Sequence, residues 1–446
     1  MQPPVPVERW QSRSTFVLAL ALAAVGLGNV WRFGWLLGEN GGGPFFLSYV
    51  VCLLLVAVPL LVAEVLLGSH GRGSPFLTMG WATENSGRSR IWLVAALLGC
   101  LAAFLALAAV LLLAGWCLAY LFHMQLGEFS AMRLDDVAGF LAMRLENPVE
   151  LLEWQLLLAV IVGLISVAGI RRGLGLFAWV AIPSVMALGG LLIDYAIRYG
   201  DLTAAGEYLF AWQTLDFDRG SFMNALVHAG STLIAGVAVG LSYGAHAPDR
   251  LPIVRSVLAV ALFDLVMAVT VALVVFPLIF EANVRPSEGF SLLFVAVPFA
   301  YGNMPFGDVF GALFFLLVVL TLVGSAVALT EPLLGILEQQ LGVQRRRAVL
   351  AVIFPAWLLS SLALVDLDGG VGPGVLQQID STATGFLIPA ALLLFALFVG
   401  WRMPRDLLRA ELSREPDILF SLWYFLIRFL VPPVIAIAWL WSRLVS

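Results

Sequence analysis

Five polar residues inside apolar stretches carry side-chain oxygens that could bind a cation. Asn29, Thr232, Asp264, Thr321 and Ser325 are each flanked by mostly apolar residues. Their amide, carboxylate and hydroxyl oxygens are ligands that hard cations prefer. A carboxylate in the middle of an apolar segment is costly, so Asp264 is a candidate functional residue. The alternative is that Asp264 is a structural partner for a buried arginine or a helix end.

The composition indicates where these residues must lie. Of the 446 residues, 61% are hydrophobic and 12% are charged, and the mean hydropathy is +0.99. A soluble chain of this length needs many more polar residues to cover its surface. We therefore expect an all-α polytopic membrane protein, because helices satisfy their backbone hydrogen bonds within lipid.

Eleven apolar segments are long enough to cross a bilayer, which takes about 20 residues. They are residues 15–37, 44–68, 91–123, 154–170, 174–199, 221–246, 252–281, 307–338, 347–364, 374–400 and 418–442.

Arginine sets the expected orientation. The clusters at 9–13, 72–90, 171–172, 345–347 and 402–414 all fall in loops on one side of the eleven segments, together with Arg250. Basic loops face the cytoplasm, which predicts a cytoplasmic N-terminus and an extracytoplasmic C-terminus in the inner (plasma) membrane. The opposite loops carry acidic residues, among them Glu128, Asp366 and Asp368.

Several chemistries are disfavoured. All 24 basic residues are arginine, so the chain has no lysine for a Walker A loop or a Schiff base. Cys52, Cys100 and Cys117 stand in apolar runs without metal-ligand spacing, and the four histidines are scattered. We expect no enzyme activity. We also expect no nucleic-acid partner, because the arginines form short clusters instead of one basic face.

Two membrane segments contain glycine pairs near their middle, Gly26-Leu27-Gly28-Asn29 and Gly236-Val237-Ala238-Val239-Gly240. A lone pair of this kind favours close helix packing. Here the pairs fall in the first and sixth segments, which are equivalent positions in two five-helix halves. This pattern predicts an inverted-repeat transporter with its binding site at two broken helices. The expected parts are a cytoplasmic segment (1–14), the first repeat (15–200), the second repeat (201–400), and a loop with helix 11 (401–446).

The stretch around the first break carries a family resemblance. Gly26-Leu27-Gly28-Asn29, Trp31-Arg32-Phe33 and Gly38-Glu39-Asn40-Gly41-Gly42-Gly43-Pro44-Phe45 closely resemble the first-span signature of the neurotransmitter:sodium symporter family. Further resemblances are Pro59 and Glu64, the stretch from Arg172 to Pro183, and Glu331-Pro332. The resemblance runs in order over about residues 8–400. It implies the leucine-transporter fold and sodium-coupled uptake, often of amino acids.

The resemblance also implies two sodium sites and two gates. The first site would use the Ala24 carbonyl, Asn29, Thr232 and Asp264. The second would use the Leu22, Val25 and Thr321 carbonyls with Ser325, and position 324 would add a ligand. The outer gate would pair Arg32 with Asp380. Gln339 replaces an expected aspartate at the cytoplasmic gate, where Arg9 with Glu338 could substitute.

Several residues depart from the family pattern. Val110, Ser231 and Val237 stand where aromatic side chains usually contact the solute, which predicts a wide apolar pocket. Asp264 replaces an asparagine, and Gly324 replaces a hydroxyl or an acid. His228 replaces a glutamine near the outer gate, and a lone histidine is more often structural. The expected solute-binding residues are Ala24, Gly26, Gly28, Ala106, Val110, Ser231, Thr232, Ile234, Val237, Ser325 and Leu329.

Two hypotheses for the solute stay open. Asp264 could supply the negative charge that an amino-acid carboxylate usually brings to the first sodium site, and the solute would then not be a standard α-amino acid. Alternatively, backbone amides at Gly26 and Gly28 hold an amino-acid carboxylate. Because Asp264 lies one helical turn from Ala268, where some relatives carry an acid, we expect no chloride requirement. The number of sodium ions per cycle, one or two, and the oligomeric state, monomer or homodimer, remain open. A non-transporting solute receptor or a sodium leak pathway is the alternative function.

Overall fold

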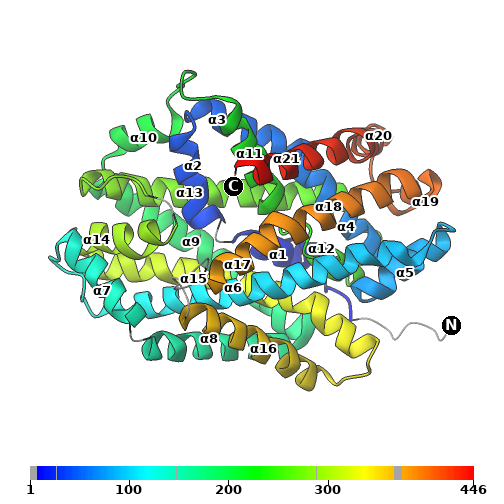
Figure 1. Ribbon diagram of the computed structural model, residues 1–446, viewed down its shortest axis with the longest axis horizontal. Coiled ribbons are helices and arrows are strands. Elements are labelled where there is room, and N and C mark those ends of the chain that lie inside the picture. The colour runs from blue at the N-terminus through cyan, green and yellow to red at the C-terminus, as the bar shows by residue number, and fades with distance from the viewer. Residues whose placement is uncertain (1–7, 27, 147, 288, 366–373, 446) are drawn as a thin grey trace.

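The computed structural model describes residues 8–26, 28–146, 148–287, 289–365 and 374–445 (Figure 1). Within these ranges the chain forms helices and no β-strand, and one isolated bridge joins Gly42 to Trp212. Residues 1–7, Leu27, Asp366 and Asp368, on which some expectations rest, lie outside the described residues.

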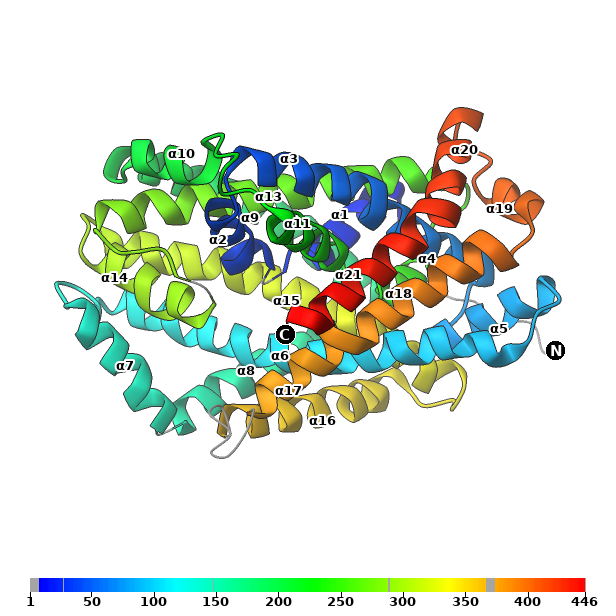
Figure 2. The ribbon, with the colours of Figure 1, turned by 45° about the horizontal axis from the view of Figure 1, so that its top comes forward.

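Nine helical stretches of the described chain are long and apolar enough to cross a membrane. They are Gly43–Gly71, Arg90–Gln125, Val149–Val167, Ile170–Tyr199, Ile253–Glu281, Gly307–Gln339, Arg345–Leu364, Val375–Arg402 and Asp417–Trp441. The longest helices in them are α6 (Leu93–Gln125), α9 (Leu176–Tyr199), α13 (Ile253–Glu281), α15 (Gly307–Gln339) and α16 (Arg345–Val365). They run side by side along the long axis of the molecule (Figures 1 and 2).

The two remaining spans are interrupted. In the first, α1 (Arg13–Ala24) is followed by a π-turn, η1 (Gly28–Arg32), and by α2 (Phe33–Glu39), with a bend of 56° between the two halves. In the sixth, α11 (Arg219–Thr232) and α12 (Val239–Ala245) are separated by six non-helical residues. With these two, the all-helical architecture has the eleven spans that the sequence predicts.

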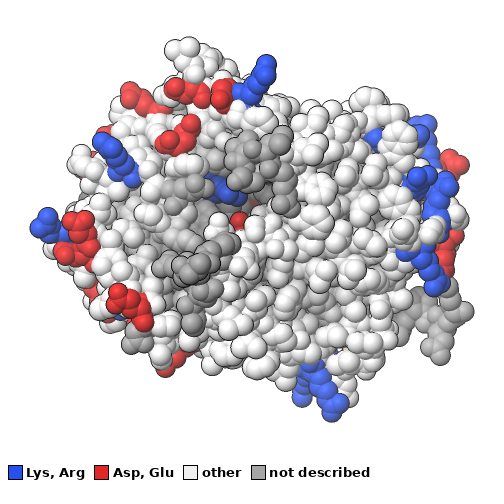
Figure 3. Space-filling view, in the orientation of Figure 1, with Lys and Arg blue, Asp and Glu red and all other residues white. Residues whose placement is uncertain are grey.

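Short helices cap both ends of the bundle. α7 (Leu134–Glu146), α10 (Leu202–Phe210) and α14 (Val297–Gly302) lie at one end of Figure 1, and α5 (Pro75–Asn85) and α19 (Arg405–Glu411) lie at the other. The loops with the predicted cytoplasmic arginines belong to the second end. In Figure 3 basic side chains gather there, whereas acidic side chains are more frequent at the α7–α10 end.

Prolines shape three of the spans and the short helix Leu292–Gly302 in the same way. The π-turns η2 (Leu53–Ala57), η5 (Leu292–Ala296), η6 (Ala383–Leu387) and η8 (Leu426–Leu430) each end two residues before a proline. Proline lacks an N–H, and its ring crowds the carbonyl four residues earlier. A wider turn relieves that crowding but leaves the carbonyl in need of a donor.

Tryptophans supply two of these donors. The Trp439 indole N–H donates to the Gly385 carbonyl, four residues before Pro389, at 2.8 Å. The Trp401 indole N–H donates to the Arg428 carbonyl, four residues before Pro432, also at 2.8 Å. These bonds connect the turns that flank α18 (Ile388–Leu397) to η8 and to α21 (Val431–Val445). Trp423 of α20 (Asp417–Phe425) is buried and donates to the Pro59 carbonyl.

Glycines bring α4 (Val58–Gly71) against the inner half of the sixth span. A Cβ at Gly68 would stand 2.1 Å from the Leu241 carbonyl oxygen, and one at Gly244 would stand 2.3 Å from the Val65 carbonyl oxygen. Only glycine permits such an approach between two backbones. The resulting contact fixes α12 beside α4, and this positions Glu64 at the second break.

Candidate functional site

The two helix breaks form the centre of the site. Around the second break, Ile234, Gly236 and Ala238 have φ angles of 53°, 81° and 56°. A left-handed conformation at a non-glycine residue is strained and is concentrated at functional sites. The sequence places this break at Gly236–Gly240, and the structure starts it at Leu233 and returns to helix at Val239, so Gly240 is already helical.

Asp264 of α13 lies between the two breaks and is fully buried. The Asn29 amide donates to Asp264 Oδ1 at 2.9 Å and to the Asp264 carbonyl at 3.2 Å. The Thr232 hydroxyl donates to Asp264 Oδ2 at 2.9 Å. The partners of the Asp264 carboxylate are the neutral side chains of Asn29 and Thr232.

This cluster contains the oxygen set expected for a cation. Asn29 Oδ1 faces the broken helix, where it accepts the Gly26 N–H at 3.2 Å. Asn29 and Thr232 are buried, and each comes from the end of a broken helix. The structure therefore brings Asn29, Thr232 and Asp264 together from three spans. Ala24, whose carbonyl is also expected here, is the last residue of α1, just before the first break. A cation entering here would exchange the two hydrogen bonds for ion–oxygen contacts.

The second expected cation position differs in its details. The Ser325 hydroxyl donates to the Ala23 carbonyl at 3.1 Å and to the Val25 carbonyl at 3.0 Å. The Thr321 hydroxyl is used within its own helix, by donation to Val318. At Gly324, an added Cβ would stand 2.3 Å from Cγ of Leu22, so the Leu22 side chain fills the space beside this glycine. Val25 and Ser325 are brought together, whereas position 324 contributes no oxygen.

Glu64 is a site residue that the sequence indicates only through the family resemblance. Its side chain is fully buried, and Oε1 accepts the Gly236 N–H at 2.5 Å. A Cβ added at Gly240 would stand 2.7 Å from Glu64 Cβ and 2.8 Å from Oε2. Glu64 thus accepts a hydrogen bond from a backbone N–H that has no helical partner at the second break. The signal was present in the sequence, because a carboxylate inside a membrane span is a functional candidate by itself.

An aromatic group lies above the cation cluster. His228 of α11 is buried, with its ring centroid 5.4 Å from Tyr49 and 6.0 Å from Phe33. A Cβ at Gly28 would stand 3.3 Å from His228 Cε1, so Gly28 permits the close approach of the histidine to the first break. This stacking could not be predicted from the sequence, because the three rings come from three different helices.

The two residues of the expected outer gate, Arg32 and Asp380, are both exposed. At the inner end, Arg9 pairs with Asp249, and Glu338 pairs with Arg345 at 3.3 Å, so the structure does not bring Arg9 and Glu338 together here. The sequence analysis placed Arg345 only in a basic loop, and the pair of Arg9 with Glu338 stays a prediction.

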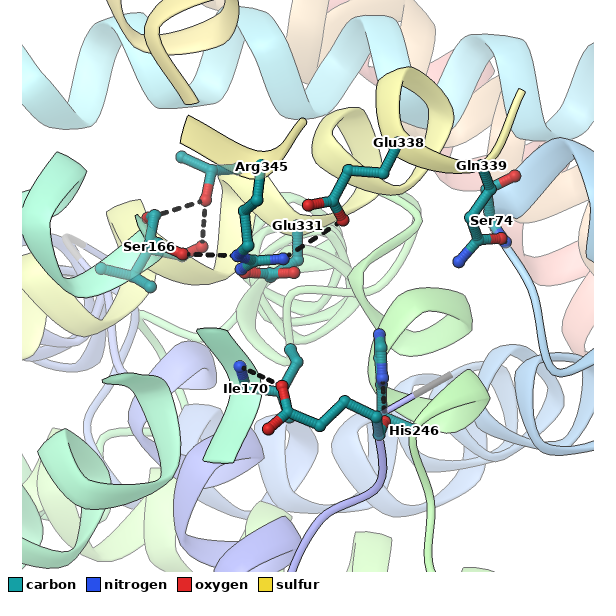
Figure 4. A network of polar contacts seen from close by, with 11 residues as sticks. Ser74, Ser166, Ile170, His246, Glu331, Glu338, Gln339 and Arg345 are labelled. Carbon is teal, nitrogen blue, oxygen red and sulfur yellow. Dashed lines mark hydrogen bonds and ion pairs between the residues drawn. The ribbon is translucent and has the colours of Figure 1, made fainter. Parts of the chain in front are cut away.

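Arg345 instead organises a polar network at the inner end (Figure 4). It contacts Glu331, Glu338 and the Ser166 carbonyl, the last at 2.7 Å. Nearby, the Glu8 carboxylate accepts the Ile170 N–H at 3.2 Å. The neighbouring Trp10 is 2% exposed, and its indole donates to the Tyr243 carbonyl at 3.1 Å. The segment before α1 is therefore held closed against α12 and the end of α8 (Val149–Val167).

The expected solute-binding residues differ in accessibility. Val237, Ser325 and Leu329 are buried, Ala106, Val110 and Ile234 are partly exposed, and Ser231 is exposed. A Cβ at Gly26 would stand 3.9 Å from Ser325 Oγ, so the first break and α15 approach each other here. No aromatic side chain occupies positions 110, 231 or 237.

Comparisons with known proteins agree with this architecture. The model of the sodium:neurotransmitter symporter family matches residues 7–124 and 149–446. A sodium-dependent transporter of Bacillus subtilis is 28% identical, with 98% of this chain and 97% of the relative covered. A sodium-dependent transporter of Methanocaldococcus jannaschii is 28% identical, with 97% and 89% covered.

A solved structure extends the likeness to three dimensions. The crystal structure of MhsT in complex with L-phenylalanine superposes with a TM-score of 0.88 at 28% identity, covering 98% of this chain and 99% of MhsT. MhsT has the leucine-transporter fold, so the broken helices and the buried oxygens between them stand in a sodium-dependent transporter architecture and not in an enzyme. The chain belongs to the sodium:neurotransmitter symporter family.

Proposed function

We propose that the protein couples the entry of a sodium ion at Asp264 to the transport of a small organic solute by alternating access. The observation that carries this proposal is the hydrogen-bonded cluster of Asn29, Thr232 and Asp264 at the two helix breaks. A buried carboxylate without a cationic side chain as partner attracts a cation, and carboxylate, amide and hydroxyl oxygens suit a hard ion such as sodium.

The expected division into five-helix repeats (15–200 and 201–400) would put this site between the two repeats. The breaks in the first and sixth spans meet at the interface between the repeats, where transporters of this design bind their ligands. Helix 11 (within 401–446) lies outside both repeats. Alternating access then amounts to movement of the broken spans relative to the long, unbroken helices.

The solute is an amino acid or an amino-acid-like molecule. The missing aromatic groups at Val110, Ser231 and Val237 favour a bulky or apolar side chain, and MhsT is described as a complex with L-phenylalanine. Two binding modes remain distinct. Either Asp264 replaces the negative charge of the solute carboxylate, or the bared amides near Gly26 and Gly28 hold that carboxylate.

Chloride has no expected role. Asp264 is a fixed negative charge beside the proposed sodium position, so an additional anion is not needed to balance the ion. Transport in chloride-free gluconate buffer should therefore equal transport in chloride buffer. Strict chloride dependence would contradict this assignment of the Asp264 charge.

The contacts of Arg345 hold the inner network together in the state described here. The gathering of arginines at the end that carries the inner network supports a cytoplasmic location of that end in the plasma membrane (Figure 3).

Uptake into proteoliposomes tests the function. Wild-type protein should accumulate a radiolabelled solute only under an inward sodium gradient, whereas Asp264→Ala should lose this uptake. Ser184→Ala is a matched control, because Ser184 is partly exposed and its hydroxyl donates to the Val180 carbonyl of its own helix. Sodium-dependent binding without flux would favour a receptor, and sodium flux without solute would favour a leak pathway.

The solute is found first by a thermal-shift screen of amino acids and related compounds, with and without sodium. A common amino acid whose binding requires its carboxylate would exclude the first binding mode. Binding of an analogue that lacks the carboxylate would exclude the second.

A further inference from the structure

Arg428 is a charged residue inside the eleventh span. It lies in η8, between two apolar helical segments of the span Asp417–Trp441, and is partly buried. A cation in a membrane helix is costly and is normally paired with an anion or directed to a polar cavity. The partner of Arg428 is therefore informative.

Arg428 has aromatic neighbours and no carboxylate. Its Nη1 donates to the Tyr424 hydroxyl at 2.6 Å, and its Cζ lies 5.1 Å from the Trp401 ring centroid and 5.4 Å from that of Phe429. Its Nε is buried without an acceptor. Throughout the described ranges, none of the ion pairs includes Arg428. The aromatic rings stabilise a cation partly, but they do not neutralise it.

Arg405 adds a second positive charge at the same tyrosine. Its Cζ lies 5.5 Å from the Tyr424 ring centroid, compared with 5.6 Å for Arg428. Arg405 is exposed, and no described carboxylate pairs with it either. The nearby Asp417 is already paired with Arg409 at 2.6 Å. Two arginines therefore contact one tyrosine ring without a counter-ion.

The surface around the two arginines is apolar. Trp401, Phe425 and Phe429 are 51%, 56% and 51% exposed. Further along the helix, Ile437 and Leu440 are 56% and 65% exposed, at a spacing that continues the face of Phe429. Arg402, which directly follows Trp401, begins a loop with the proposed cytoplasmic arginines. Arg405 thus lies outside the spans, next to this apolar helix face, and Arg428 lies on the face within the eleventh span.

We propose that Arg405, Arg428 and Tyr424 bind the phosphate of an anionic phospholipid, with an acyl chain on the face formed by Phe429, Ile437 and Leu440. The phosphate supplies the missing negative charge, and the Tyr424 hydroxyl, which accepts from Arg428, can donate its own proton to a phosphate oxygen. Basic pockets between membrane helices on the cytoplasmic side recognise such headgroups. This site is separate from the solute and sodium positions.

Native mass spectrometry of the purified protein in detergent tests the proposal. Phosphatidylglycerol and phosphatidylcholine with identical acyl chains are titrated separately. Wild-type protein should retain phosphatidylglycerol at much lower concentrations than phosphatidylcholine. In Arg405→Gln/Arg428→Gln the apparent affinity for phosphatidylglycerol should fall roughly 30-fold, because each interfacial arginine contributes about 1 kcal/mol of attraction to an anionic lipid.

The control variant is Arg346→Gln/Arg347→Gln, which removes the same charge from two exposed arginines at the same end of the molecule. It should keep the preference for phosphatidylglycerol. If the double variant folds poorly, Tyr424→Phe serves as the test in its place. It loses only the hydroxyl and should weaken binding of phosphatidylglycerol several-fold.

Three results would overturn the proposal. Equal retention of both lipids by the wild-type protein would show that the site does not recognise an anionic headgroup. An equal loss of affinity in the control variant would show that the arginines act only by general charge attraction. If the arginine double variant loses a dimer but keeps its lipid, the surface binds a second copy of the chain. Sodium-dependent stabilisation should persist in all variants, so failure of the lipid site and failure of the transport proposal are distinguishable.

Discussion

The side chain of Leu22 occupies the place in which a side chain at position 324 would stand. A Cβ at Gly324 would lie 2.3 Å from Leu22 Cγ and 2.8 Å from one of its methyl carbons. Both residues are buried. The apolar contact between α1 and α15 has therefore replaced an oxygen at this edge of the second expected cation position.

Gly324→Ala should accordingly destabilise the protein. Overpacking of a rigid interior costs about 1–3 kcal/mol, and the melting temperature should fall. Gly190→Ala is the matched control, because a Cβ at this α9 glycine meets nothing within 4 Å, and it should leave the melting temperature unchanged or raise it. Leu22→Gly/Gly324→Ser should recover part of the loss and tighten sodium binding. If Gly324→Ala is as stable as Gly190→Ala, the packing described at Leu22 is incorrect.

Asp264→Asn should weaken sodium binding. The substitution keeps the size of the side chain but removes the charge that attracts the cation. We expect the sodium concentration for half-maximal thermal stabilisation to rise about tenfold or more, which corresponds to ~1.4 kcal/mol. Thr232→Val should have a smaller effect in the same direction, because one neutral ligand is lost. Unchanged sodium dependence in Asp264→Asn would place the ion elsewhere.

Glu64→Ala should loosen the second break. The Gly236 N–H would lose its buried acceptor, which costs roughly 1–3 kcal/mol in addition to the cavity left behind. Glu64→Gln keeps an acceptor oxygen and should be the milder change. Thermal unfolding of the three proteins measures the order, and equal stability of the alanine and glutamine variants would argue against a capping role.

Arg345→Ala should open the inner end. The change leaves Glu331, whose side chain is 3% exposed, as a buried charge without its partner, which costs on the order of 3–5 kcal/mol. Hydrogen exchange should rise over residues 8–13 and at the start of α9, since the closed side is destabilised relative to the open one. Arg346→Ala, at an exposed neighbour, should show no such rise. Protection that stays unchanged in Arg345→Ala would show that other contacts keep this end closed.

Trp401→Phe should cost about 1 kcal/mol, the net value of one hydrogen bond to a carbonyl. In a Pro432→Ala background the same substitution should cost less, because alanine at 432 restores a helical donor for the Arg428 carbonyl. The difference between the two backgrounds, measured by thermal unfolding, is the coupling between the tryptophan and the proline. Full additivity would mean that the indole does not act on the freed carbonyl.

The spans and the two breaks could be predicted because hydropathy and paired glycines act locally along the chain. Asn29, Thr232 and Asp264 could be singled out because polar oxygens are rare in apolar segments. The stacking of His228 on Phe33 and Tyr49 could not be predicted, since it depends on the relative rotation of three helices. The ion pairs at the inner end could not be predicted either. Several pairs are equally plausible among Arg9, Asp249, Glu338 and Arg345, and the packing of the helix ends decides which of them form.

The proline-freed carbonyls have a mechanical consequence. Because Trp439 and Trp401 bond carbonyls near opposite ends of the α18–α21 contact, neither helix can slide or rotate without losing one of these hydrogen bonds. We therefore expect spans 10 and 11 to move together as one rigid body during the transport cycle. A spectroscopic label on the outer surface of α21 would then report the displacement of span 10, which carries Asp380 of the expected outer gate.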